Sequence, residues 1–217
     1  MKRFLFFIIA ASLPADALAQ GITVDKDKRT ITIPAKIAPR KIEDPAYKEI
    51  YPVEVIATYP FPKGKKAHET ILTFDCKPSD VHKALVEMGL KPGKPAKSAD
   101  DKQDGPEVKL LLETSPGKPG TRVPIERFLT DKQSGKPMPK VKWLFTGSIM
   151  VKPAPDKDEV YGADLSGTLA AVFPVTPESV FQSSLSLKDE KFVKLEVTDR
   201  LPKVGTLVNL VIVVPAK

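Results

Sequence analysis

The stretch Thr206-Leu207-Val208-Asn209-Leu210-Val211-Ile212-Val213-Val214 is nearly continuous apolar and rich in β-branched residues. Such a short run is typical of a strand covered on both faces. Similar runs, many of them alternating in polarity, recur between turns rich in Lys, Pro and Gly. They predict further strands at 22–24, 30–33, 53–58, 69–74, 107–113, 141–150, 168–173 and 192–198.

One segment has the spacing of a helix. Apolar residues recur at intervals of three and four at Val81, Ala84, Leu85 and Met88. Ser79 stands where an N-cap is expected, and Gly89 stands where a left-handed residue ends a helix. We therefore expect a helix over 79–88, with shorter helical turns at 124–129 and 177–182. The pattern predicts an α+β fold, a single mainly antiparallel β domain over residues 20–217.

The first 19 residues have the three parts of a secretory signal peptide. Lys2 and Arg3 supply the positive start, residues 4–13 the apolar middle, and Ala17-Leu18-Ala19 the small residues of a cleavage site. The apolar part is about ten residues long, roughly half of what a membrane-spanning helix needs. We expect cleavage after Ala19, export to the periplasm or the outside of the cell, and no transmembrane segment in the remaining chain.

Composition excludes several classes of site. One Cys among 217 residues rules out an internal disulfide framework and an iron–sulfur cluster held by this chain alone, and two His rule out a three-histidine metal centre. Without residues 1–19 the chain has 32 Lys and Arg against 26 Asp and Glu, a net charge of +6. Because the charge is mostly Lys and aromatic residues are few, we expect no nucleic-acid binding.

The densest group of reactive side chains lies between His68 and His82, and it also holds Glu69, Asp75, Cys76 and Asp80. Cys76 precedes the predicted helix, whose N-terminal dipole favours a thiolate. One interpretation is therefore a reactive Cys76, or a metal or redox site that uses His68, Cys76 and His82. The other is that Cys76 is an inert buried residue and His82 a hydrogen-bonded residue on the flank of the helix.

Known catalytic motifs are incomplete. Ser148 lies in Thr146-Gly147-Ser148-Ile149-Met150, which lacks the second Gly of a nucleophile elbow. Trp143 alternates with Val141 and Phe145, a pattern that predicts core packing. No complete set of catalytic residues emerges, which favours a protein that is not an enzyme.

Six phrases occur in a characteristic order, at 68–72, 77–85, 89–93, 143–148, 161–167 and 201–206. With them the chain resembles the YdjY-domain family of exported bacterial proteins over nearly its whole length after residue 19. The resemblance implies no particular activity, substrate or cofactor. It points to a shared surface or pocket at the residues its phrases contain: His68, Glu69, Asp80, His82, Trp143, Ser148 and Asp164. One departure is Val172, where the resemblance leads us to expect Asn before Phe173-Pro174.

These observations favour an exported, non-catalytic binding or accessory module of the bacterial envelope. Its partner would be an envelope protein or a small ligand, bound near the strand–helix corner at 68–82. Two alternatives stay open. One is the metal- or redox-linked protein, and the other is a binder of anionic cell-wall polymers, which the net charge would attract.

Overall fold

Strand β2 (Thr30–Ile37) shows how the sequence builds the sheet. Its residues Ile31, Ile33 and Ile37 are buried in the core, while Lys36 between them is exposed. This alternation directs one face of the strand inward. The computed structural model describes residues 21–118 and 120–216, so the predicted signal peptide lies outside the described residues.

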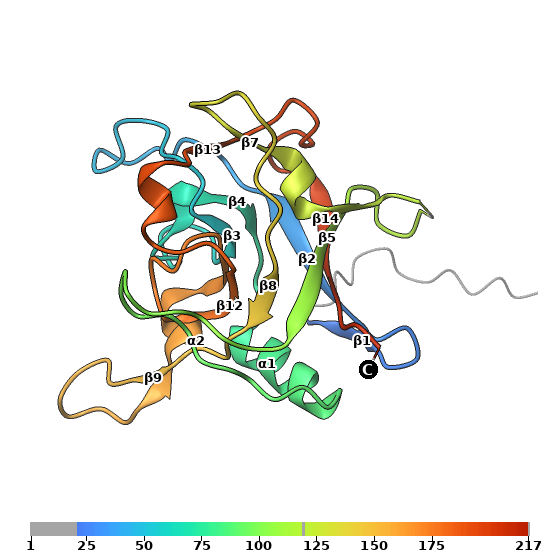
Figure 1. Cartoon of the computed structure of the whole chain (residues 1–217), viewed down its shortest axis with the longest axis vertical. Helices are drawn as coiled ribbons and strands as arrows, with labels where there is room; N and C mark the ends of the chain where they lie inside the picture. Colours follow the sequence, from blue (N-terminus) through green and yellow to red (C-terminus); the bar gives the residue numbers. More distant parts are fainter. Residues whose placement is uncertain (1–20, 119, 217) are drawn as a thin grey trace, which may run out of the picture.

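Eight strands close into a β-barrel, because β2 pairs both with the second strand of the ring and with the last (Figure 1). Neighbouring strands are antiparallel except in the pairs β3–β4 and β11–β12. In order around the ring they are β2, β14 (Leu207–Val213), β5 (Glu107–Glu113), β8 (Trp143–Phe145), β12 (Ser179–Ser183), β11 (Thr168–Ala171), β3 (Val55–Thr58) and β4 (Thr70–Thr73).

Shorter elements surround the barrel. Two strands extend its sheet, β1 (Thr23–Asp25) beside β2 and β6 (Arg122–Pro124) beside β5. Two separate ribbons form from β7 (Leu129–Asp131) with β13 (Leu195–Val197) and from β9 (Met150–Val151) with β10 (Val160–Tyr161). The helical elements are α1 (Pro78–Glu87), α2 (Gly162–Ser166) and the 3₁₀ turns η1 (Ala67–Glu69), η2 (Ile125–Phe128) and η3 (Asp189–Lys191).

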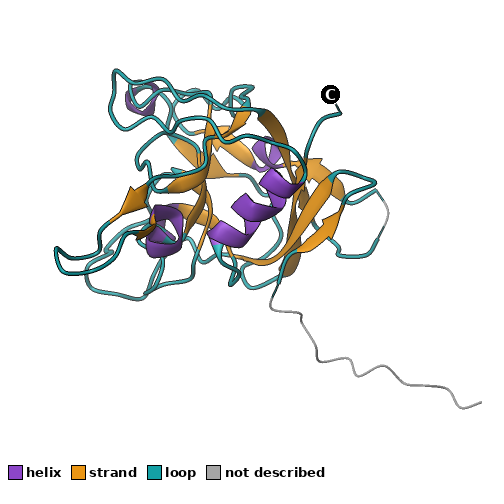
Figure 2. Cartoon of the chain, turned by 90° about the horizontal axis from the view of Figure 1, so that it is seen from below, coloured by secondary structure: helices purple, strands orange, loops and turns teal. Residues whose placement is uncertain are grey.

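Helix α1 lies across one end of the barrel, which Figure 2 shows from below. Its residues Val81, Ala84 and Leu85 are buried and belong to the same apolar core as the inward faces of the strands. The helix therefore closes the core at this end. No helix in residues 21–118 and 120–216 has the length and apolar character to cross a membrane.

The predicted helix is present one residue earlier than expected, and its N-cap prediction was wrong. Pro78 takes the first helical position, and the backbone N–H of Ser79 donates to Asp164 Oδ1 of α2 at 2.8 Å. The predicted C-terminus is confirmed: Gly89 has φ +87°, and Leu90 N–H donates to the Leu85 carbonyl at 3.1 Å. This bond is the long hydrogen bond of a Schellman motif.

The coarse prediction, mostly β with one well-formed helix, is confirmed, but closure into a barrel was not predicted. Each predicted strand range overlaps a strand, and the middle of β14 is covered on both faces, since Leu210, Val211 and Ile212 are all buried. The helical turn at 124–129 corresponds to η2. The one at 177–182 was wrong, because this segment pairs with β11 and β8 as the fully buried strand β12.

The predicted strand at 141–150 divides into β8 and β9. Gly147 and Ser148 separate them, with φ values of +86° and +63°. Two consecutive left-handed residues turn the chain sharply, so it leaves the barrel wall after Phe145.

Candidate functional site

The structure distributes the predicted site residues over four places instead of one. His68 and Glu69 form η1, Cys76 follows β4, and Trp143 is in the core. The fourth place joins α1 to α2 and contains His82, Ser148 and Asp164, with Asp80 exposed nearby on α1.

His82 is part of a hydrogen-bonded chain with Tyr161. The Tyr161 hydroxyl donates to the Gly147 carbonyl at 2.8 Å and lies 2.9 Å from His82 Nδ1. Since the hydroxyl has a single hydrogen, Nδ1 must carry the proton and donate to the Tyr161 oxygen. Burial lowers the pKa of His82, against a weaker opposing effect of the Gly147 backbone. The ring is therefore neutral near pH 7 and serves as a connector between α1 and the Gly147 turn.

Ser148 and Asp164 hold α2 in place. Ser148 Oγ accepts a hydrogen bond from the backbone of Ala163 at 3.0 Å, and Asp164 caps α1 through Ser79. A carboxylate near the first turn of a helix also interacts favourably with its dipole. Both side chains are thus used in joining helices.

His68 lies in a different cluster, among aromatic rings. Its ring centroid is 4.4 Å from that of Tyr47 and 5.1 Å from that of Tyr51, and its Nε2 lies 3.1 Å from Glu69 Oε1. Burial lowers the pKa of His68, although Glu69 acts in the opposite direction. The strand predicted at 69–74 begins only at Thr70, and His68 lies before it in η1, so His68 and Cys76 do not share a strand face.

Glu69 is also one of a pair of buried carboxyl groups. Lys66 Nζ lies 2.8 Å from Glu69 Oε2 and 3.6 Å from Glu54 Oε2. Burial and the neighbouring Glu69 carboxylate raise the pKa of Glu54 to about 7. The Lys66 ammonium group therefore lies close to two carboxyl groups, and the Glu54 carboxyl is protonated at mildly acidic pH.

Cys76 is half-buried, and its environment disfavours the thiolate. Burial, followed by the nearby carboxylate of Asp80, raises the pKa of the thiol to about 12. In one interpretation of the sequence the position before α1 lowers this pKa, but burial and the acidic side chains around the thiol outweigh the helix dipole. The thiol is therefore protonated at neutral pH.

Cys76 lines a groove of about 440 Å³ on the outside of the barrel, which we call the seam groove. The groove lies where β2 changes partner, from β1 over Thr30–Thr32 to β4 over Lys36–Ile37. Pro34 falls between the two pairings, where a residue without an N–H leaves no donor unpaired. The lining is mostly apolar and includes Pro34, Pro60, Phe74, Pro116, Leu207 and Val208.

A second hollow of about 560 Å³ lies near Leu90 and Pro106 and is more open to solvent. It contains none of the predicted site residues. Of these two cavities, the seam groove is the one that contains part of the predicted 68–82 corner, through Cys76.

Trp143 has the structural role predicted from its alternation. It is 2% exposed, and its Nε1–H donates to Glu126 Oε1 at 2.5 Å. Tyr161, Glu54 and Lys66 were missed. Their signal in the sequence is weak, since Glu54 is one polar residue in an alternating run and Lys66 stands in a loop with other Lys residues. Only the fold brings each residue to its partners.

The metal hypothesis has no assembled ligand set. No group of three or more His, Cys, Asp or Glu side chains is placed to hold a metal ion within the described part of the chain. His68 and His82 belong to separate clusters, each packed among its own aromatic neighbours. A site using His68, Cys76 and His82 stays a prediction from the sequence.

The fold and its groove define a class: a small β-barrel closed at one end by a helix, with an external cavity where the barrel wall changes partner. The chain belongs to the YdjY-domain family, since the model of the YdjY domain matches residues 22–213. No curated protein and no solved structure matches the chain. The matched range extends from the residue before β1 to the last residue of β14, so the family domain includes the whole barrel.

Proposed function

We propose that this protein is an exported, non-catalytic binding module of the bacterial envelope that holds a small ligand in the seam groove. The observation that carries the proposal is the groove itself. Its volume of about 440 Å³ and its mostly apolar lining are typical of small-molecule sites. The groove also lies at the strand–helix corner where the sequence predicts that a partner or ligand binds.

The contacts of the reactive side chains support binding without catalysis. His82 connects α1 to the Gly147 turn, His68 is packed between Tyr47 and Tyr51, and the Cys76 thiol is held protonated. A general base or nucleophile needs a free partner and a suitable pKa, which none of these arrangements offers.

Nile red, a neutral dye whose emission rises in apolar surroundings, tests the groove. Leu207 lines the groove and is 46% exposed, so Leu207→Glu places a charge in it with little effect on the core. We expect dye binding to weaken at least tenfold. Val204→Glu is the matched control, because Val204 is 60% exposed and lies outside the groove. Equal dye binding by the wild type and both variants would contradict the proposal.

Export is tested separately. Expression of the full chain in a bacterium, followed by fractionation and N-terminal sequencing, should yield a protein that begins at Gln20 in the exported fraction. A chain that keeps Met1 and stays in the cytoplasm would contradict this part of the proposal.

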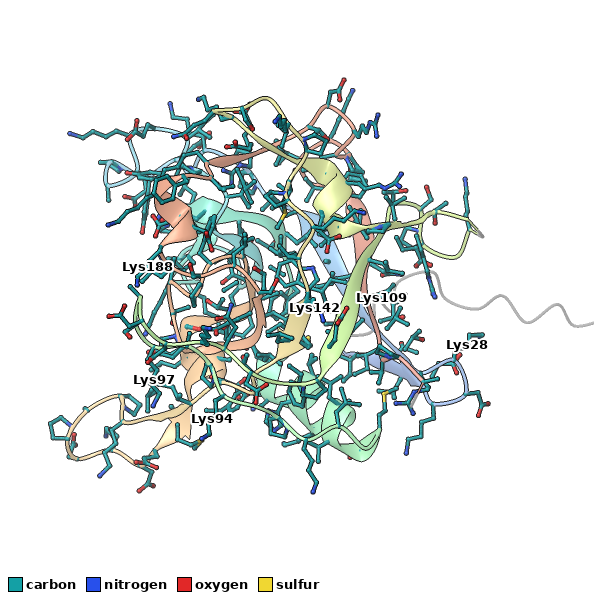
Figure 3. All side chains as sticks on the ribbon, viewed as in Figure 1. Lys28, Lys94, Lys97, Lys109, Lys142 and Lys188 are labelled. Carbon is teal, nitrogen blue, oxygen red and sulfur yellow. The ribbon has the colours of Figure 1, made fainter. Side chains whose placement is uncertain are left out.

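A second candidate, binding of an anionic polymer, is favoured by one feature of the barrel wall. Continuing the β5–β8 register from Val108↔Trp143 by one residue places Lys109 opposite Lys142, and Figure 3 shows the two side by side. Like charges directly opposite are unfavourable and would be relieved by a bound anion. Lys142 has a partner in Glu107 at 3.3 Å, whereas Lys109 makes no ion pair with any described residue.

Heparin chromatography tests this second candidate. If the face binds polyanions, the variant with Lys109→Gln and Lys142→Gln elutes at lower salt than the wild type. The single variant Lys203→Gln, exposed elsewhere, should elute like the wild type. Identical elution of all three proteins would count against the lysine face.

A further inference from the structure

Two opposite charges stand at the seam groove without partners. Lys36 of β2 and Asp75 after β4 both line the groove and are both exposed. Neither makes an ion pair or a side-chain hydrogen bond with any residue in 21–118 and 120–216.

The register places both charges on the outer side of the wall. Lys36 pairs with Thr73, and the buried Phe74 separates Thr73 from Asp75. Because side chains alternate along an extended chain, Thr73 and Asp75 point to the same side as Lys36. Asp75 lies two residues beyond Thr73, the partner of Lys36, which corresponds to about 7 Å along an extended chain.

One other polar group of the groove, the Asn209 side chain, is already used. The Asn209 side chain donates from Nδ2 to Glu113 Oε2 at 2.6 Å, and Glu113 also pairs with Arg122 Nε at 3.0 Å. Apolar surface from Leu207, Val208 and Pro60 completes the lining. The groove thus offers a cation and an anion, separated by about two residues of extended chain, beside an apolar surface.

We propose that the seam groove binds a small zwitterion with an apolar body: a free apolar amino acid or a short apolar peptide with both termini unblocked. The ammonium group pairs with Asp75, the carboxylate pairs with Lys36, and the apolar side chains lie on Leu207 and its neighbours. Complementary charges select such a ligand over neutral molecules of similar size. This inference rests on the proposed binding function and names its ligand class.

The dipeptide Leu-Leu is the test ligand, titrated into ¹⁵N-labelled protein of residues 20–217. We expect chemical-shift changes at Lys36, Thr73 and Asp75. N-acetyl-Leu-Leu and Leu-Leu amide, each lacking one charge, should bind at least tenfold more weakly. Equal affinity for Leu-Leu and for the doubly blocked N-acetyl-Leu-Leu amide would overturn the inference.

Two variants test which charge of the groove binds which terminus of the dipeptide. Asp75→Asn should abolish the preference for a free amino group while keeping the preference for a free carboxylate, and Lys36→Gln should do the reverse. Asp158→Asn and Lys109→Gln, exposed and outside the groove, are the matched controls and should behave like the wild type. If both groove variants discriminate like the wild type, the assignment is wrong.

The two proposals fail in different ways. Leu207-dependent binding of Nile red without any preference for Leu-Leu over its blocked forms would leave the binding function standing and overturn the zwitterion. Absence of both Nile red and Leu-Leu binding would overturn both. Amide spectra that match the wild type outside the groove show that each variant is folded.

Discussion

Tyr161 shows how a single side chain joins segments that are far apart in sequence. Its hydroxyl contacts His82 on α1 and the Gly147 carbonyl in the turn after β8. Tyr161→Phe removes the group but keeps the ring, which leaves the half-buried His82 Nδ1 and the buried Gly147 carbonyl without this partner. We expect the free energy of unfolding to decrease by on the order of 2 kcal/mol, measured by urea denaturation.

Tyr47→Phe is the matched control for this change. The Tyr47 ring stacks on His68, but its hydroxyl makes no hydrogen bond with the described residues. Its loss should change the free energy of unfolding by less than about 0.5 kcal/mol. Similar effects of the two variants would show that the Tyr161 hydroxyl has no special role.

Glu54 makes stability depend on pH. The folded carboxyl holds its proton up to about pH 7, whereas its ordinary pKa is 4.5. The folded state therefore binds more protons between these values, and the free energy of unfolding decreases as the pH rises through this window. Glu54→Gln removes this dependence. We expect the variant to match the wild type near pH 4.5 and to exceed it by on the order of 2 kcal/mol at pH 8.

Urea denaturation at a series of pH values between 4.5 and 8 measures this difference. The exposed Glu196→Gln should follow the wild-type curve at every pH. A constant offset between Glu54→Gln and the wild type would mean that Glu54 has an ordinary pKa in the folded protein.

At the scale of elements, Gly89 and Gly147 each end a segment in a similar left-handed backbone conformation, but their surroundings differ. Gly89 after α1 has φ +87° and open space around an added Cβ, whereas Gly147 has φ +86° and would bring a Cβ to 2.4 Å from Pro92 Cβ. Gly89→Ala should therefore cost about 1 kcal/mol of unfolding free energy, from backbone strain alone. Gly147→Ala should cost at least about twice as much.

Thermal and urea unfolding of both variants measure these costs. Gly89→Asn is the control, because Asn tolerates the left-handed region, and it should recover part of the loss. Equal costs for Gly89→Ala and Gly147→Ala would mean that Pro92 moves aside freely.

The elements also show what the sequence could reveal. The periodicity of Val81, Ala84 and Leu85 identified α1, because it reflects a face that must be buried. The pairing of β12 was hidden, since Ser179, Gln182 and Ser183 are polar and the segment 177–182 was predicted to be a helical turn. They are buried because their side chains bond the surrounding backbone. Gln182 Oε1, for instance, accepts from Ala96 N–H at 2.9 Å.

At the scale of the whole molecule, the barrel closes through one of its two shortest ladders, the other being β5–β8. β2 pairs with β4 at two positions and with β14 at seven. The β2–β4 seam should therefore open more easily than the β2–β14 part of the wall. We expect the Ala38 amide, which donates to the Ile71 carbonyl, to exchange with solvent at least tenfold faster than that of Ile33 in the β2–β14 ladder.

Hydrogen exchange followed by NMR measures both amides in one experiment. Equal protection of Ala38 and Ile33 would show that the barrel opens only as a single unit. A ligand in the seam groove should slow exchange at Ala38 and leave Ile33 unchanged.

The site was less predictable than the fold because it depends on closure. The sequence identified Cys76 and the corner at 68–82, but Lys36, Leu207 and Pro34 come to this corner only when β2 and β14 complete the ring. The sequence of a short strand does not indicate which distant strand it will pair with. His68 and His82, close in sequence, were separated for the same reason.

Trp143 provides this protein with a built-in optical reporter. It is the only tryptophan in the chain, it is 2% exposed, and its β8 stands on the part of the ring away from the β2–β4 seam. Its fluorescence should therefore be blue-shifted in the native protein and shift to longer wavelength when the barrel unfolds. Because the indole is remote from the groove, its emission reports the integrity of the barrel in the same sample in which groove occupancy is followed by other means.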